Sequence, residues 1–81
     1  MSPNAFKTGL YYSNGAYGRN WGVRMITAIT TDEDGETRLT FKGVAGTCRR
    51  KAGECSAAEF ARWAKYQVVL CENDWKRVAD D

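Results

Sequence analysis

The distribution of apolar and polar residues predicts three strands in the first half of the chain. Residues 6–12 form a short aromatic run, and residues 14–20 after it are rich in Gly and Asn, as is typical of a loop. The clearest strand covers residues 21–31, where apolar side chains recur at every second position. Such alternation places one face of a strand on a core, and Ile26 is the exception that points to the other face. A third strand is expected over residues 37–44.

The turn between the second and third strands follows from the register of their apolar residues. A three-residue hairpin turn that ends with Gly35 in the left-handed conformation is common. It sets Ile29 opposite Leu39, and the same register pairs Thr27 with Phe41. A two-residue turn would mix apolar and polar residues on both faces, so we expect the three-residue turn.

The second half of the chain predicts a loop, one helix and a last strand. Residues 45–53 hold two glycines, a basic triplet and no periodicity, and should form a loop. Ser56 and Glu59 form a capping-box pattern ahead of an apolar stripe, which predicts a helix over residues 56–66. The β-branched run at residues 68–71 predicts the last strand, followed by a short helical turn at the C-terminus.

These elements predict an α+β fold of a single domain over residues 1–81, with a small antiparallel β-sheet, the element order β-β-β-α-β and one helix packed on one face. Phe60 and Trp63 should carry the helix side of the core. The sheet side is expected to come from Val23, Ile29, Leu39, Phe41 and Leu70. The opposite face of the sheet then has little to cover it.

Composition is compatible with a folded domain, and the charges are unevenly distributed. Of the 81 residues, 43% are hydrophobic and 12% aromatic, which is globular rather than disordered. The net charge is only +2, but residues 1–31 contain no acid, four of residues 32–36 are acidic, and residues 38–51 contain five bases and no acid. The folded chain can therefore have one basic face although its net charge is small.

The titratable residues argue against catalysis and against a metal or cofactor. The chain has no His, which removes the commonest general base and metal ligand, and no Gly-rich phosphate-binding motif. Cys48, Cys55 and Cys71 are too few for a structural zinc site unless an acid such as Glu54 or Glu72 joins them. We therefore expect no enzyme activity, no metal and no cofactor.

Cysteine usage and hydropathy favour a cytoplasmic protein with reduced thiols. The cysteine count is odd, the N-terminal residues lack an apolar targeting region, and no apolar run is long enough for a membrane span. Cys71 in its β-rich run is expected to be a small buried residue. Cys48 and Cys55 flank one loop, so a bridge between them under oxidation stays open.

Aromatic residues interleaved with arginines form the candidate interaction surface. Tyr11 and Tyr12 are adjacent in a strand, so only one of them can join the helix-covered core. The surface that we predict on the open face and its rim consists of Tyr12, Tyr17, Arg19, Arg24 and Ile26. Tyr with Arg stacks nucleic-acid bases or anchors a protein interface, and cross-strand aromatic pairing is the purely structural alternative.

A second candidate is the basic triplet Arg49, Arg50 and Lys51. Three cations on a loop between glycines can contact phosphate groups or an acidic protein, and the alternative is a solvated loop with no partner. Because the triplet precedes the helix start at Ser56, the binding alternative includes an anion site to which both contribute.

Taken together, these features predict a non-enzymatic interaction protein, an inhibitor or adaptor that docks on a larger protein or ribonucleoprotein. The alternative is a DNA- or RNA-binding module that uses the basic loop and the aromatic and arginine residues of the sheet face. In size and economy the chain is similar to small stand-alone proteins of phages and mobile elements that inhibit host defence complexes, and no motif carries this likeness. No membrane partner is expected, and monomer and homodimer stay open.

Overall fold

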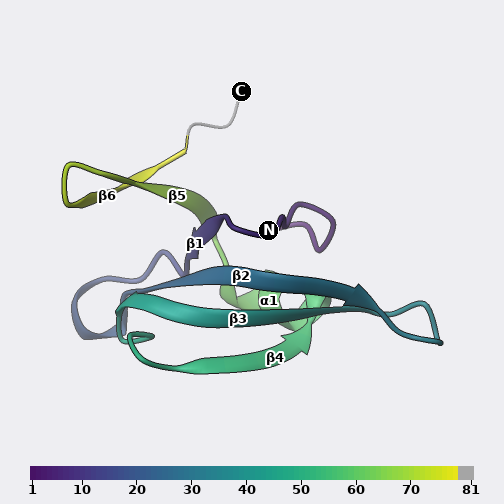
Figure 1. Cartoon of the computed structure of the whole chain (residues 1–81). Coiled ribbons are helices and arrows are strands. Elements are labelled where there is room, and N and C mark those ends of the chain that lie inside the picture. Colours follow the sequence, from purple (N-terminus) through teal and green to yellow (C-terminus); the bar gives the residue numbers. More distant parts are fainter. Residues whose placement is uncertain (79–81) are drawn as a thin grey trace.

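A computed structural model describes residues 1–78 and contains, within them, one six-stranded antiparallel sheet and one α-helix (Figure 1). The sheet order is β4-β3-β2-β1-β5-β6. The elements are β1 (Tyr11–Ser13), a 3-10 turn η1 (Gly18–Asn20), β2 (Gly22–Thr31), β3 (Thr37–Gly46), β4 (Ala52–Ser56), α1 (Ala57–Trp63), β5 (Tyr66–Cys71) and β6 (Asp74–Arg77). The predicted α+β class, with an antiparallel sheet and one helix, is confirmed.

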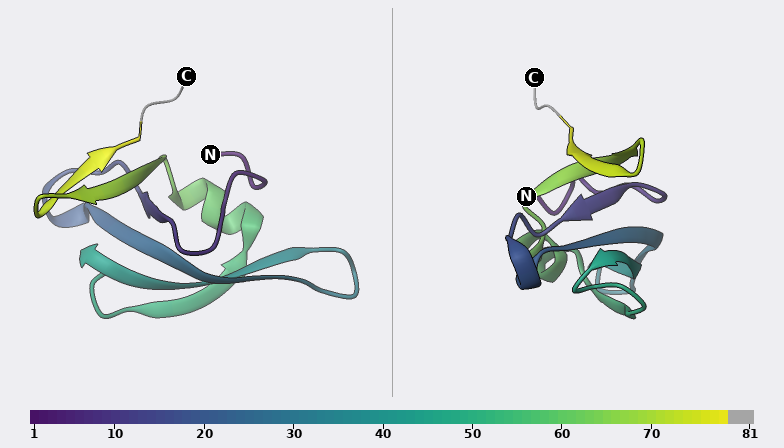
Figure 2. Two further views of the ribbon diagram at one scale, coloured as in Figure 1. Left: turned by 45° about the horizontal axis from the view of Figure 1, so that its top comes forward. Right: turned by 90° about the vertical axis from the view of Figure 1, so that its left-hand side faces the viewer.

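The long hairpin of β2 and β3 forms the main body of the sheet. Each of these strands has ten residues, whereas β1 has only three and joins β2 to β5. Figure 2 shows that β5 and β6 are turned away from the plane of β2, β3 and β4, as the right-handed twist of a sheet requires. Helix α1 lies on one side of the main body.

Aromatic rings fill the space between α1 and the sheet. Phe60 is completely buried and contacts four other rings. The distances from its ring centroid are 4.9 Å to Phe6, 5.9 Å to Tyr12, 5.7 Å to Phe41 and 5.5 Å to Trp63. Phe6 and Tyr12 meet edge to face, an arrangement that the ring quadrupoles favour. Phe60 is therefore the centre of the core.

The N-terminal segment differs from the predicted strand over residues 6–12. Only its last two residues belong to β1, because the backbone turns at Gly9, which has a φ of 84°. Phe6 is thereby placed in the core instead of in the sheet. The amide of Lys7 donates a hydrogen bond to the Tyr12 hydroxyl at 3.0 Å, which ties this segment to β1.

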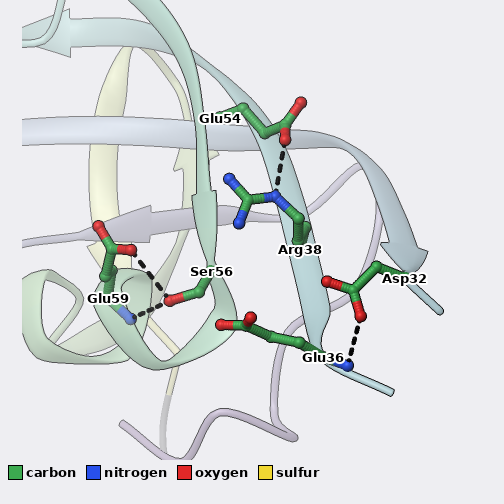
Figure 3. Close-up of polar contacts among 6 residues, drawn as sticks. All are labelled: Asp32, Glu36, Arg38, Glu54, Ser56 and Glu59. Atoms are coloured by element: carbon green, nitrogen blue, oxygen red, sulfur yellow. Dashed lines mark hydrogen bonds and ion pairs between the residues drawn. The ribbon is translucent and has the colours of Figure 1, made fainter. Parts of the chain in front are cut away.

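The turn between β2 and β3 has the predicted form. Gly35 has a φ of 80°, the Asp32 amide donates to the Glu36 carbonyl at 2.9 Å, and Ile29 lies opposite Leu39. The Asp32 carboxylate also accepts from the Glu36 amide at 2.8 Å (Figure 3).

Beyond this turn the predicted register fails at a β-bulge. Phe41 lies opposite Ile26 instead of Thr27, because the register shifts between Ile26 and Ala28. An extra residue exchanges the two faces of a strand. Ile26 therefore shares the face of Phe41 and is fully buried beneath α1, the reverse of the prediction. Ile29 keeps its predicted place opposite Leu39 on that same face, but it is 37% exposed and not in the core.

Two strands were missed in the second half of the chain. Both ends of the predicted loop over residues 45–53 are strand, since β3 extends to Gly46 and β4 begins at Ala52, and only residues 47–51 connect them. The predicted C-terminal helical turn is instead β6. It follows β5 through a two-residue turn in which Glu72 and Asn73 both have positive φ, as in a tight hairpin. Leu70 and Cys71 belong to this hairpin and are exposed, whereas the sequence analysis expected both to be buried.

Helix α1 begins where the capping box predicts. The Ser56 hydroxyl accepts from the Glu59 amide at 3.1 Å and donates to the Glu59 carboxylate at 3.2 Å (Figure 3). The helix ends at Trp63, three residues early, because Ala64 is extended and leads into β5. Within residues 1–78 no helix has the length and apolar character needed to cross a bilayer.

The position of Phe60 predicts a large loss of stability on truncation. Phe60→Ala should lower the free energy of unfolding by about 3–5 kcal/mol, because it empties the centre of the ring cluster. Phe60→Leu refills part of the space and should lose less. Urea denaturation measures both variants, and Tyr17→Ala, at a side chain that is 92% exposed, is the control. A wild-type midpoint for Phe60→Ala would contradict this description of the core.

Candidate functional site

Two connections lie side by side at one end of the sheet, on the left in Figure 1. One is the β1–β2 loop (residues 14–21), and the other is the β3–β4 turn (residues 46–51, which include Gly46 at the end of β3). The amide of Thr47 donates a hydrogen bond to the carbonyl of Trp21 at 2.7 Å, which joins them. Gly46 packs against the Trp21 backbone with a φ of 62°, a position where any side chain would overlap its neighbour.

The β3–β4 turn packs with its backbone directly on the sheet. A Cβ atom at Gly43 would overlap the carbonyl of Cys48, and one at Gly22 would lie 2.6 Å from the Cys48 sulfur. The Cys48 side chain is accordingly buried. Three backbone hydrogen bonds close the turn, from the amides of Arg49, Lys51 and Gly43 to the carbonyls of Gly46, Cys48 and Lys51 at 3.1, 3.0 and 2.6 Å. The basic triplet therefore sits on an ordered turn and not on a long loop.

A single side chain organises the β1–β2 loop. The Asn14 carboxamide oxygen accepts from the amides of Ala16 and Gly22 at 3.2 and 3.1 Å, and its nitrogen donates to the Asn20 carbonyl at 2.6 Å. Between these anchors, Tyr17 is 92% exposed, with extended backbone angles just before η1. The loop thus holds one aromatic ring in solvent.

The adjoining loops present an exposed aromatic ring among cations. We call this set the loop-end surface: Tyr17, Arg19, Arg49, Arg50 and Lys51. Neither residues 14–21 nor residues 46–51 contain an acid. The only ion pair among residues 1–78 lies elsewhere, so none of these four cations is held in an ion pair with a described carboxylate. The sequence predicted all five residues, but as members of two separate regions.

The opposite end of the sheet is acidic. Asp32, Glu33, Asp34 and Glu36 lie at the β2–β3 turn, about 30 Å from the loop-end surface along strands of ten residues. Arg38 is the cation within this group, and its Nε bonds the Glu54 carboxylate at 2.8 Å (Figure 3). That hydrogen bond and the charge of Glu54 raise the pKa of Arg38. Both side chains are exposed, so solvent screens the pair and it adds little stability.

Two residues of the predicted interaction surface are inaccessible. Tyr12 and Ile26 are fully buried in the aromatic core, so the expectation that they contact a partner is wrong. Burial raises the pKa of the Tyr12 hydroxyl, and its hydrogen bond from Lys7 opposes that shift only in part. The tyrosine that faces the other side of the sheet is Tyr11, whose ring packs 5.0 Å from Trp75.

Arg24 has a structural position in place of the predicted accessible one. Its guanidinium carbon lies 4.4 Å from the ring centroid of Phe41 and 4.1 Å from that of Trp63. Contacts of this geometry are cation–π interactions. Arg24 therefore links the sheet to the end of α1, beside the Phe60 cluster.

The basic triplet and the helix start do not form one anion site, contrary to the sequence prediction. Strand β4 separates Lys51 from Ser56 by about 16 Å along its five residues. Cys48 and Cys55, at the two ends of this segment, are both free thiols, and burial is the main cause of a raised pKa at Cys55. Within residues 1–78, no group of three potential metal ligands and no ligand-sized pocket is present.

Comparison with known proteins finds no family model, no curated protein and no solved structure that matches this chain. The loop-end surface is therefore the feature of this chain from which a function can be inferred. Sequence reasoning missed that its two loops are neighbours. The available signal was the set Gly22, Gly43 and Gly46, whose missing side chains allow the close backbone contact.

Gly43→Ala tests the seating of the basic turn. The added methyl group overlaps the Cys48 carbonyl, so the turn must move away from the sheet and expose the Cys48 thiol. The test uses a Cys55→Ser/Cys71→Ser background, in which Cys48 is the remaining cysteine. There, Gly43→Ala should make Cys48 react with a thiol reagent at least about tenfold faster. It should also lower the free energy of unfolding by about 1–3 kcal/mol. An unchanged thiol reaction rate would contradict the close packing.

Arg24 should matter for stability and not only for surface charge. Arg24→Met keeps most of the side-chain packing and should lower the free energy of unfolding by about 1 kcal/mol through the lost cation–π contacts. Arg24→Glu should lose more, because a carboxylate meets the negative faces of the Phe41 and Trp63 rings. Urea denaturation measures both variants. A wild-type midpoint for Arg24→Glu would mean that Arg24 is a surface residue, as the sequence predicts.

Proposed function

We propose that this protein works by binding another macromolecule through the loop-end surface, without catalysing a reaction. The observation that carries the proposal is the hydrogen bond between Thr47 and Trp21, which joins the two loops. This bond places Tyr17 and four cations on two neighbouring loops, and each loop is held in shape by its own hydrogen bonds. A surface that is ordered before binding loses less conformational entropy when the partner docks.

The residue types of this surface also support binding. Tyr and Arg are enriched among the residues that dominate binding energy at interfaces. Four cations that form no ion pair with a described carboxylate favour a positive field around these two loops, and the acidic β2–β3 turn favours a negative one at the other end of the sheet. Such polarity orients an anionic partner during encounter and accelerates association.

An inhibitor or an adaptor acts in this way, by occupying a surface of its target. Docking on a host protein or ribonucleoprotein therefore remains within the proposal. The narrower prediction of a phage or mobile-element origin stays a prediction, as does the cytoplasmic location.

Capture from a lysate with matched charge variants tests the proposal. The loop-end variant carries Arg19→Gln, Arg49→Gln and Lys51→Gln. The control carries Lys7→Gln, Arg62→Gln and Lys76→Gln, which removes the same number of exposed charges elsewhere. We expect the control to retain the macromolecules that the tagged wild-type protein captures and the loop-end variant to lose them. Equal capture by the two variants would place the binding surface elsewhere.

A further inference from the structure

We propose that the macromolecule bound at the loop-end surface is a single-stranded nucleic acid. This inference rests on the proposed function and adds the chemistry of the partner. It follows from two features that coincide on this surface, a group of cations suited to phosphate and an aromatic ring that is available for stacking.

The cations match a phosphate backbone. Arg19, Arg49 and Arg50 have planar guanidinium groups, which bind phosphate oxygens through two parallel hydrogen bonds, and Lys51 adds a fourth charge. A polymer with one negative charge per repeat gains from each cation that it passes. Because residues 14–21 and 46–51 contain no acid, nothing on either loop repels such a backbone.

Tyr17 distinguishes a nucleic acid from an acidic protein surface. Its side chain is 92% exposed, and its ring has no aromatic neighbour among the described residues. A nucleic acid carries a flat base beside every phosphate, so a ring beside cations meets both groups at once. An acidic protein surface supplies carboxylates but no regular series of flat faces.

Stacking on an isolated ring also favours single strands over duplexes. In a duplex the base faces are covered by neighbouring bases, whereas in a single strand they are available to an aromatic side chain. Tyr17 precedes η1 on a loop that projects from the end of the sheet, and Trp21 of the same loop is bonded to the basic turn. Phosphate and base contacts can thus come from adjoining loops.

Fluorescence anisotropy with labelled oligothymidine at low salt tests the inference. The wild-type protein should bind this single strand more tightly than a duplex of the same length. Tyr17→Ala should weaken binding to oligothymidine roughly tenfold through the lost stacking, and Tyr17→Phe should retain it.

Removal of the basic triplet should change the salt dependence in a defined way. The variant is Arg49→Gln/Arg50→Asn/Lys51→Gln, with Asn at position 50 because the φ of 66° there suits Asn. Loss of three phosphate contacts should reduce the slope of log affinity against log salt by about 2. The Lys7→Gln/Arg62→Gln/Lys76→Gln control should leave the slope unchanged, and circular dichroism should show wild-type folding for both variants.

Polyglutamate is the probe for charge without bases. It should bind more weakly than oligothymidine and should not respond to Tyr17→Ala. Equal affinity for polyglutamate, equal or tighter binding of the duplex, or no binding of oligothymidine at low salt would each overturn the inference. A different outcome would separate the two proposals: oligothymidine does not bind, but a protein partner is captured after nuclease treatment and only when the loop-end surface is intact. In that case the proposed function stands and the nucleic-acid inference is wrong.

Discussion

The close contact of the β3–β4 turn with Gly22 and Gly43 is the constraint on which the candidate site depends. Neither glycine has a side chain, so the carbonyl of Cys48 occupies the space that a Cβ at Gly43 would need, and the Cys48 sulfur packs against Gly22. This contact fixes the turn where the amide of Thr47 reaches the β1–β2 loop. The cations of both loops therefore form one surface, although some thirty positions separate them in the chain.

The rest of the fold supplies a stable base for this end of the molecule. Small domains have thin cores. In this one, residues of the N-terminal segment, β1, β3 and α1 all pack against the ring of Phe60. Arg24 covers the edge of that cluster through Phe41 and Trp63. Because the long hairpin of β2 and β3 carries acidic residues at one end and adjoins basic ones at the other, its length sets the distance between the two charged ends.

Local features were predictable from the sequence, and features that depend on packing were not. The capping box at Ser56 and the left-handed Gly35 turn each follow from a few adjacent residues, and both were predicted correctly. The bulge beside Thr27 was not predictable, because alternation assumes an unbroken register, and it placed Ile26 on the core face instead of the open one. The five residues of the loop-end surface were recognised by type. Their proximity depends on a tertiary backbone contact that no local pattern encodes.

Nuclear magnetic resonance titration with oligothymidine tests the central claim most directly, because it locates binding residue by residue. Backbone amide resonances of residues 14–21 and 46–51 should shift together and saturate at the same concentration, while those of residues 32–36 at the acidic end stay in place. Two separate saturation curves for the two loops, or shifts centred on the exposed β5–β6 hairpin around Leu70, would contradict a single loop-end surface.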